Sequence, residues 1–202
     1  MIFIGKYNKS VVLTYVGITI ALTGIIFSFL GNVSNAMICL IFSGICDLFD
    51  GKIARACKRD EYEKEFGKQL DSLADVFLFL GQPCAIGINL LLDLPWICYL
   101  FLALYTISGV IRLAWFNMIS SKDEPVKYFT GVPVAYIALF LPIVYTLELI
   151  FRFNFSIIYL LIYIVFSFLF IFNIKIAKPK GMWYVFFFVL AIIVTIIIKV
   201  VG

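Results

Sequence analysis

The sequence predicts an all-α integral membrane protein of about seven transmembrane helices, folded as one domain over residues 1–202. The chain is 64% hydrophobic and only 14% charged, a far more apolar balance than soluble domains have. Seven apolar runs are each close to the length that a helix needs to cross a bilayer. Most of the basic residues between these runs fall on one side of the predicted membrane, as multi-pass proteins arrange them.

The expected helices follow from the apolar runs and from the polar breaks between them. The first run is too long for a signal-peptide core and long enough to span a membrane. Short breaks at 31–34 and 93–95 predict turns, and the charged stretch 57–66 predicts a polar loop. The expected helices cover about residues 11–30, 35–56, 67–92, 96–119, 132–150, 155–172 and 182–200.

Lysine and arginine predict the orientation of the chain. Seven spans place the two termini on opposite sides of the membrane. If the N-terminus is cytosolic, all basic residues except Arg152 and Lys199, or 14 of the 16, lie in cytosolic loops or adjoining helix ends. This is a strong positive-inside bias. We therefore predict a multi-pass protein of the cell membrane whose polar segment 47–75 faces the cytosol.

Four aspartates stand in or beside apolar segments, where a lone carboxylate is costly. Asp47 and Asp50 are spaced i, i+3, and Asp71 and Asp75 are spaced i, i+4, so each pair shares one helix face. Two such faces turned toward each other form a cage of four carboxylates, and hard divalent cations favour oxygen-only ligands. The alternative is a cluster of ion pairs with nearby cations, Lys52, Lys68 and Arg112.

The composition excludes several other kinds of site. Histidine is absent, which removes His-based triads, imidazole bases and His metal ligands. A general base must then be Asp, Glu, Lys, Tyr or Cys. The five cysteines have no metal-binding spacing and lie mostly in apolar runs, as small buried residues do; they are Cys39, Cys46, Cys57, Cys84 and Cys98.

The segment 47–75 resembles the signature of the CDP-alcohol phosphotransferases, D-x2-D-G-x2-A-R followed after a spacer by G-x3-D-x3-D. Its spacer, residues 56–66, is eleven residues long, where the family more often has eight. We expect the longer spacer to alter the cytosolic surface and to leave the cage intact. Thr14 loosely matches an N-x-x-T found early in the family, without its asparagine. The matching signature residues are Asp47, Asp50, Gly51, Ala54, Arg55, Gly67, Asp71 and Asp75.

The resemblance implies the helical bundle of that family, with a catalytic site near the cytosolic face. Two divalent cations, Mg²⁺ or Mn²⁺, would be held by the four aspartates, and Asp75 would also take the proton of the attacking hydroxyl. From spacing alone, Gly51 and Ala54 equally suit close helix packing, and Arg55 equally suits an interfacial anchor. The resemblance assigns nucleotide and diphosphate binding to Asp47, Gly51, Ala54, Arg55 and Gly67.

A second resemblance concerns the acceptor. SGVIRLAWFN at 108–117 and FTGVP at 129–133 are similar to segments of bacterial and archaeal phosphatidylserine synthases, with Trp115 in place of an arginine. This implies transfer of a phosphatidyl group from CDP-diacylglycerol, or CDP-archaeol, to the hydroxyl of L-serine, with release of CMP. Arg112 could bind the serine carboxylate, or a phosphate, bidentately, or pair with an aspartate. Lys127, in a predicted cytosolic loop, is a weaker acceptor candidate, because a position in solvent or among lipid headgroups suits it better.

Two other functions remain open. A sister transferase would use glycerol 3-phosphate or an inositol phosphate, and would need more cationic residues around its acceptor pocket. A transporter or channel with a carboxylate ion site is the alternative of another class, although the four acids lie toward one membrane face. The expected partners are a CDP-linked lipid, L-serine, the bilayer and, by family analogy, a second copy in a homodimer; nucleic acid is not expected.

Overall fold

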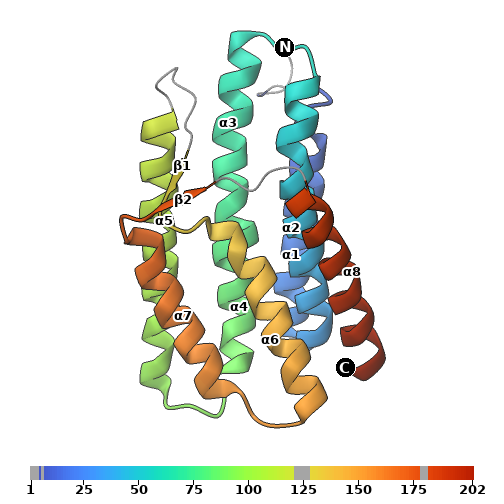
Figure 1. The fold of residues 1–202 in the computed structure, drawn as a ribbon, viewed down its shortest axis with the longest axis vertical. Helices are drawn as coiled ribbons and strands as arrows, with labels where there is room; N and C mark the ends of the chain where they lie inside the picture. The colour runs from blue at the N-terminus through green and yellow to red at the C-terminus, as the bar shows by residue number, and fades with distance from the viewer. Residues whose placement is uncertain (1–4, 6, 121–127, 178–181) are drawn as a thin grey trace.

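The computed structural model describes residues 5, 7–120, 128–177 and 182–202. Their helices run roughly side by side along one axis, and a short two-stranded ribbon lies at one side of the bundle (Figure 1). The elements are α1 (Val12–Phe29), α2 (Val33–Ala56), α3 (Glu61–Asp75), η1 (Val76–Gly81), α4 (Gln82–Leu90), η2 (Trp96–Tyr99), α5 (Leu100–Ser120), β1 (Tyr128–Thr130), η3 (Val134–Tyr136), α6 (Ile137–Phe151), α7 (Ser156–Ile171), β2 (Lys175–Ala177) and α8 (Met182–Val201).

The predicted helical membrane fold is confirmed. Within the described ranges each expected helix has a counterpart, with α3, η1 and α4 forming one continuous rod. Four segments are long and apolar enough to cross a membrane, and Ser156–Ile171 and Val185–Val201 are apolar but shorter. The count of seven spans therefore stays a prediction. The four segments are Val12–Phe29, Glu61–Leu90, Trp96–Ile119 and Val134–Phe151.

The third helix begins earlier than the sequence suggested. We expected a polar loop over 57–66, but α3 starts at Glu61, so the connection from α2 is short. The backbone N–H of Glu63 donates to the Asp60 carboxylate at 2.6 Å, and the N–H of Asp60 donates to the Glu63 carboxylate at 3.1 Å. This reciprocal capping box stabilises the start of a helix. Its D-x-x-E pattern is present in the sequence, but the high charge of the segment led us to expect a loop there.

A π-helical segment, η1, follows Asp75 directly. Such segments are rare and are frequent at functional sites. The Tyr105 hydroxyl of α5 donates to the Phe79 carbonyl within η1 at 2.5 Å, so a side chain from another helix satisfies part of the altered backbone. The π-helical segment therefore joins the acidic helix α3 to the apolar helix α4 within the continuous rod.

Two glycines let neighbouring helices approach this rod closely. A β-carbon at Gly109 of α5 would lie 2.2 Å from Leu80 Cδ2, and one at Gly24 of α1 would lie 2.1 Å from Gln82 Nε2. Gln82 is fully buried, and its Nε2 donates to the Ala36 carbonyl of α2 at 3.1 Å. The rod that carries Asp75 is thus held by α1, α2 and α5.

The β1–β2 ribbon was not predicted. Its strands are antiparallel, with Phe129 opposite Ile176, and three residues are too few to show a strand pattern in sequence. Gly131, directly after β1, has φ +75°, and a β-carbon there would lie 2.7 Å from the Phe170 carbonyl. Its N–H donates to the Ile174 carbonyl at 2.9 Å. The FTGVP segment therefore packs against the end of α7.

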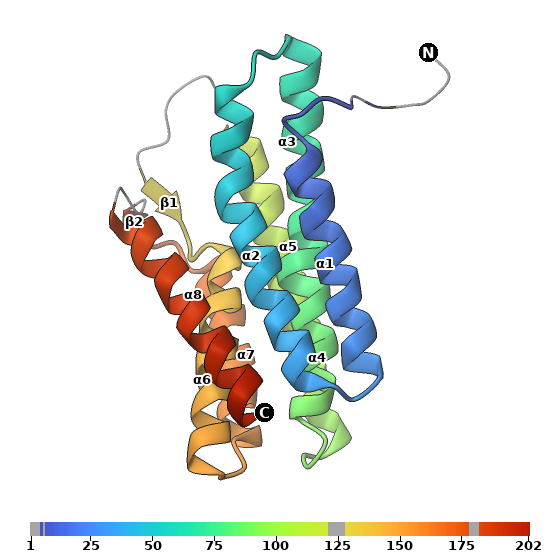
Figure 2. The same cartoon turned by 90° about the vertical axis from the view of Figure 1, so that its right-hand side faces the viewer.

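The two ends of the bundle differ in charge. The α2–α3 connection and the start of α1 lie at one end (Figure 2). The α6–α7 connection, which begins at Arg152, and the last turn of α8, which contains Lys199, lie toward the other. The two basic residues that departed from the positive-inside pattern are thus at the end opposite to the acidic segment.

Candidate metal and active site

Three of the four predicted aspartates converge in the structure. Asp47 and Asp50 come from α2 and Asp71 comes from α3, and one carboxylate oxygen from each lies within 4.8 Å of the others. The i, i+3 spacing turns the first two toward α3, as the sequence predicted. Asp50 is buried, Asp47 is half-buried and Asp71 is exposed. Their oxygens therefore surround a point that is open on one side.

Asp75 adds the fourth carboxylate one turn further along α3. Its side chain lies within hydrogen-bonding distance of Asp47, as that of Asp50 does of Asp71. Its Oδ1 is buried and has no hydrogen-bond partner among the described residues. Buried polar atoms are normally paired, and grouped carboxylates need positive charge or protons between them. An oxygen-only set of this kind fits hard divalent cations.

A threonine orients the cluster from α1. The Thr14 hydroxyl donates to Asp50 Oδ2 at 3.2 Å, and both side chains are buried. Hydrogen bonds of this kind fix the direction of a metal-binding carboxylate. The only sign of it in the sequence was the loose N-x-x-T match. On the other side of α3, the Ser72 hydroxyl donates to Asn117 Oδ1 of α5 at 2.8 Å.

A cleft of about 380 Å³ opens beside the carboxylates. We call it the polar cleft, and its volume falls within the range of small-molecule sites. It contains every residue predicted to bind the nucleotide except Asp47. It is lined by Ser10, Val11, Thr14, Asp50, Gly51, Ala54, Arg55, Arg59, Lys64, Gly67, Lys68, Asp71, Ser72, Asp75, Phe116 and Asn117.

Two guanidinium groups lie over the two glycines of the signature. A β-carbon at Gly51 would lie 3.4 Å from Arg55 Nη1, and one at Gly67 would lie 3.4 Å from Arg59 Nη1. Glycine leaves space for these cations and for a ligand beside them. The cleft wall thus combines carboxylates with cations that suit phosphate oxygens.

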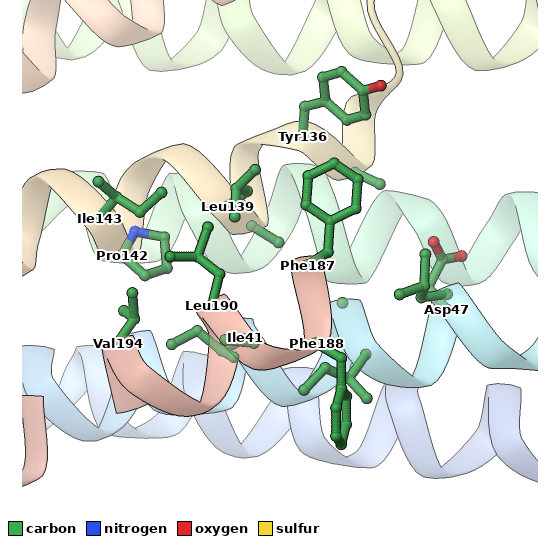
Figure 3. A pocket seen from close by; sticks show the side chains of 16 residues that line it. Ile41, Asp47, Tyr136, Leu139, Pro142, Ile143, Phe187, Phe188, Leu190 and Val194 are labelled. Atoms are coloured by element: carbon green, nitrogen blue, oxygen red, sulfur yellow. The ribbon is translucent and has the colours of Figure 1, made fainter. Parts of the chain in front are cut away.

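A second hollow, the apolar groove, lies between α2, α6 and α8 (Figure 3). It has a volume of about 130 Å³. Asp47 stands at one end of it, beyond Phe187 and Phe188 of α8 (Figure 3). Sequence reasoning gave the last helix no role. The lining residues are Ile41, Gly44, Ile45, Asp47, Leu48, Ala135, Tyr136, Ala138, Leu139, Pro142, Ile143, Phe187, Phe188, Leu190, Ala191 and Val194.

Of the two residues predicted to bind the acceptor, the structure describes only Arg112. Arg112 is buried in α5, its guanidinium carbon is 5.6 Å from the Phe116 ring centroid, and it lies near enough to Asp75 to feel the charge of that carboxylate. Its Nε has no hydrogen-bond partner in the described part of the chain. Arg112 itself does not line the polar cleft, whereas Phe116 and Asn117, just over one turn further on, do. Lys127 lies outside the described residues.

The fold and the site together define a helical membrane protein. Its cluster of carboxylates, which is compatible with a metal, lies where the polar cleft and the apolar groove come together. The chain belongs to the CDP-alcohol phosphatidyltransferase family, whose sequence profile matches residues 7–197. The resemblance seen in the signature is thereby confirmed. The roles of the individual site residues are not tested by this match and stay predictions.

Part of the chain is similar to curated proteins that are named as serine transferases. The chain is 32% identical over 110 residues to an archaetidylserine synthase of Methanothermobacter thermautotrophicus, covering 54% of this chain and 46% of that protein. It is 34% identical over 107 residues to a CDP-diacylglycerol–serine O-phosphatidyltransferase of Bacillus subtilis, covering 52% and 56%. A yeast protein of the latter name, from Saccharomyces cerevisiae, is 34% identical over 105 residues, covering 46% and 35%. The matched region thus spans about half the length of the first two relatives.

Proposed function

We propose that this protein transfers a lipid phosphatidyl group from a CDP-linked lipid to the hydroxyl of L-serine and releases CMP. The observation that carries this proposal is the position of Asp47, which belongs to the carboxylate cluster and also lines the apolar groove. A substrate with a charged head and hydrocarbon chains would occupy both hollows at once. The names of the relatives support serine as the acceptor and leave both diacylglycerol and archaeol as lipids.

The carboxylates would hold the metal of this reaction. Asp47, Asp50, Asp71 and Asp75 would bind two divalent cations, Mg²⁺ or Mn²⁺, whose charge would balance that of the four carboxylates. When bound, these ions would neutralise the diphosphate and stabilise the departing CMP. Thr14 would keep the Asp50 carboxylate directed at this site through its hydrogen bond.

The cationic wall of the polar cleft would hold the nucleotide. Gly51, Ala54 and Gly67 would leave room for cytidine and the diphosphate, because none of them has a side chain larger than a methyl group. Arg55 would donate to phosphate oxygens, for which the planar guanidinium is well suited. The lipid chains would lie along the apolar groove, so that the reacting phosphorus comes to rest near the carboxylates.

Asp75 would act as the base. The serine oxygen would attack the lipid-proximal phosphorus, the bond from that phosphorus to CMP would break, and the hydroxyl proton would pass to the Asp75 carboxylate. Arg112, which lies near enough to Asp75 to feel the charge of its carboxylate, would bind the serine carboxylate and so hold the hydroxyl beside the base. The acceptor would enter past Phe116 and Asn117, which line the cleft on the α5 side. Lys127 is kept as a second acceptor candidate.

The site would face the cytosol of a cell membrane, where CDP-activated precursors are made. The support is the basic bias of the sequence and the placement of Arg152 and Lys199 at the opposite end. A cysteine placed at the exposed Lys58, in a cysteine-free background, should react with a membrane-impermeant maleimide in inside-out vesicles and not in intact cells. A homodimer is also proposed, and light scattering in mild detergent would measure its mass.

The decisive experiment is an assay of CMP release with purified protein. CDP-diacylglycerol and CDP-archaeol would each be offered with serine, glycerol 3-phosphate and an inositol phosphate, and Asp71→Asn would serve as the inactive control. We expect CMP and a serine phospholipid only where serine is present. Preference for a phosphorylated acceptor would assign a sister activity, and the absence of CMP release with every acceptor would contradict transferase function.

A further inference from the structure

Arg59 is the residue that the sequence gave no function and that the structure places in the site. It lies in the short connection between α2 and α3, inside the spacer whose length departs from the family's usual eight residues. This spacer was expected to alter the cytosolic surface and to leave the carboxylate cage intact. In the structure Arg59 lines the polar cleft together with Arg55 and Gly67.

The Arg59 guanidinium lacks a full set of partners. Its Nε is buried and has no hydrogen-bond partner among the described residues. Asp60 and Glu63, which follow Arg59 in the sequence, each accept a hydrogen bond from the other's backbone N–H in the capping box. A buried donor without a partner costs free energy, and a ligand that supplies an acceptor would remove this cost.

The surroundings of Arg59 suit an anion. Lys64 and Lys68, spaced i, i+4 on α3, line the same cleft, so they lie on one helix face. With Arg55 they bring three further cations to the wall that holds Arg59. Arg59 Nη1 lies 3.4 Å from the β-carbon position of Gly67, which fixes the level of the guanidinium along α3.

That level separates Arg59 from the proposed base. Gly67 and Asp75 are eight residues apart on α3, which corresponds to about 12 Å along the helix axis. Serine must place its hydroxyl beside Asp75, and a molecule of its size does not also reach Gly67. An anion bound by Arg59 would therefore belong to the other substrate, on the cytidine side of its reacting phosphorus.

We propose that Arg59 binds the cytidine-side phosphate of the CDP-linked lipid, as a nucleotide-binding residue contributed by the long spacer. This inference rests on the proposed function and adds to it a residue outside the signature. Arg55 binds the nucleotide phosphate from α2, and Arg59 binds it from the α2–α3 connection. Each of the two lies over a glycine of the signature. The planar fork of arginine allows two hydrogen bonds to one phosphate.

The test uses the full chain purified in detergent with Mg²⁺. Binding of CDP and of CMP is measured by calorimetry, and the KM values for CDP-lipid and for serine are measured by CMP release. The variants are Arg59→Ala, Arg59→Lys and the matched control Lys58→Ala, which removes an exposed cation next to Arg59 that does not line the cleft. Melting temperatures establish that each variant is folded.

We expect Arg59→Ala to weaken CDP and CMP binding roughly tenfold to a hundredfold, the usual range for a hydrogen bond to a charged group. The KM for CDP-lipid should rise with it, and the KM for serine should not change. Arg59→Lys should weaken CDP and CMP binding less, because lysine keeps the positive charge and loses only the planar guanidinium. Lys58→Ala should match the wild type.

Two results would overturn the assignment while leaving the proposed function standing. One is a wild-type protein that releases CMP together with an Arg59→Ala variant that binds CDP and CMP normally. The other is an Arg59→Ala variant that raises only the KM for serine. If Arg59→Ala does not fold, normal nucleotide binding by both Arg59→Lys and Arg59→Gln overturns it. A wild-type protein that neither binds CDP nor releases CMP overturns the proposed function and this assignment with it.

Discussion

The polar cleft and the apolar groove share helix α2 as a wall and offer opposite surroundings to a ligand. Asp50, Gly51 and Ala54 face the cleft, which also contains Arg55 and three further cations. A stripe of apolar and small residues one face round the helix lines the groove, Ile41, Gly44, Ile45 and Leu48. Asp47 lies between the two faces. A single helix can thus bring a charged head and a hydrocarbon chain to one point.

The contrast between the two hollows predicts which substitutions should affect the chemical step and which should affect binding of the lipid chains. Substitutions in the cleft should change turnover, metal affinity or acceptor use. Substitutions in the groove should change the use of lipid-linked substrate and leave soluble nucleotide binding alone. Four substitutions test this division, and they are given in order of decreasing effect.

The largest effect is expected from Asp75→Asn. Asparagine is nearly isosteric with aspartate and cannot take a proton, and loss of a general base lowers rates by roughly 10²–10⁴. Single-turnover CMP release should fall by this factor, while CDP-lipid binding should survive better than in Asp47→Asn or Asp71→Asn. All three variants should be compared in one detergent. A near-native single-turnover rate in Asp75→Asn would remove Asp75 as the base.

Thr14→Val should weaken metal binding. It removes the hydroxyl that donates to Asp50 at 3.2 Å, and loss of such outer partners typically costs 10–100-fold in metal affinity or activity. The measurement is the Mg²⁺ concentration for half-maximal activity, after a chelator has abolished the basal activity. Thr19→Val is the matched control, because the Thr19 hydroxyl donates only to the Tyr15 carbonyl of its own helix. An unchanged Mg²⁺ requirement in Thr14→Val would show that Asp50 needs no such partner.

Arg112→Lys should affect the acceptor. Lysine keeps the charge and loses the bidentate fork, so the serine KM should rise, or turnover fall, by roughly tenfold to a hundredfold, the contribution of about one charge-assisted hydrogen bond. Binding of CDP-lipid should change less. Arg152→Lys, on an exposed arginine at the opposite end of the bundle, is the control. Normal serine kinetics in a folded Arg112→Lys variant would make Arg112 a structural partner of Asp75.

The smallest effect is expected in the groove. Ala191→Phe places a ring where α8 lines the groove, and losing one or two buried methylenes of the lipid at ~0.8 kcal/mol each raises the KM for long-chain CDP-lipid roughly fourfold to fifteenfold. CDP binding should stay normal. Ile193→Phe, on an exposed position of α8 outside the groove, controls for helix packing. Equal effects of Ala191→Phe on CDP and on CDP-lipid would break the division between the two hollows.

The sequence alone determined the features that depend on local spacing. The i, i+3 and i, i+4 aspartate pairs fixed which acids share a helix face, and the 47–75 signature identified the family before any geometry was known. The apolar runs located the helices within a few residues. The predicted start of the third helix was wrong, because the capping box of α3 lies in a charged segment whose composition resembles that of a loop.

The tertiary structure decided everything that joins residues distant in the chain. The hydrogen bond from Thr14 to Asp50 spans 36 positions, and the groove exists only because α8 packs beside α2 and α6. The apolar pattern of α8 is the same whether it faces lipid, protein or a substrate chain, so its periodicity could not assign it a role. Arg59 was one basic residue in a charged loop, and only its position over Gly67, with Nε buried, makes it part of the site. Such neighbours are set by packing between helices, which a single sequence does not encode in any local pattern.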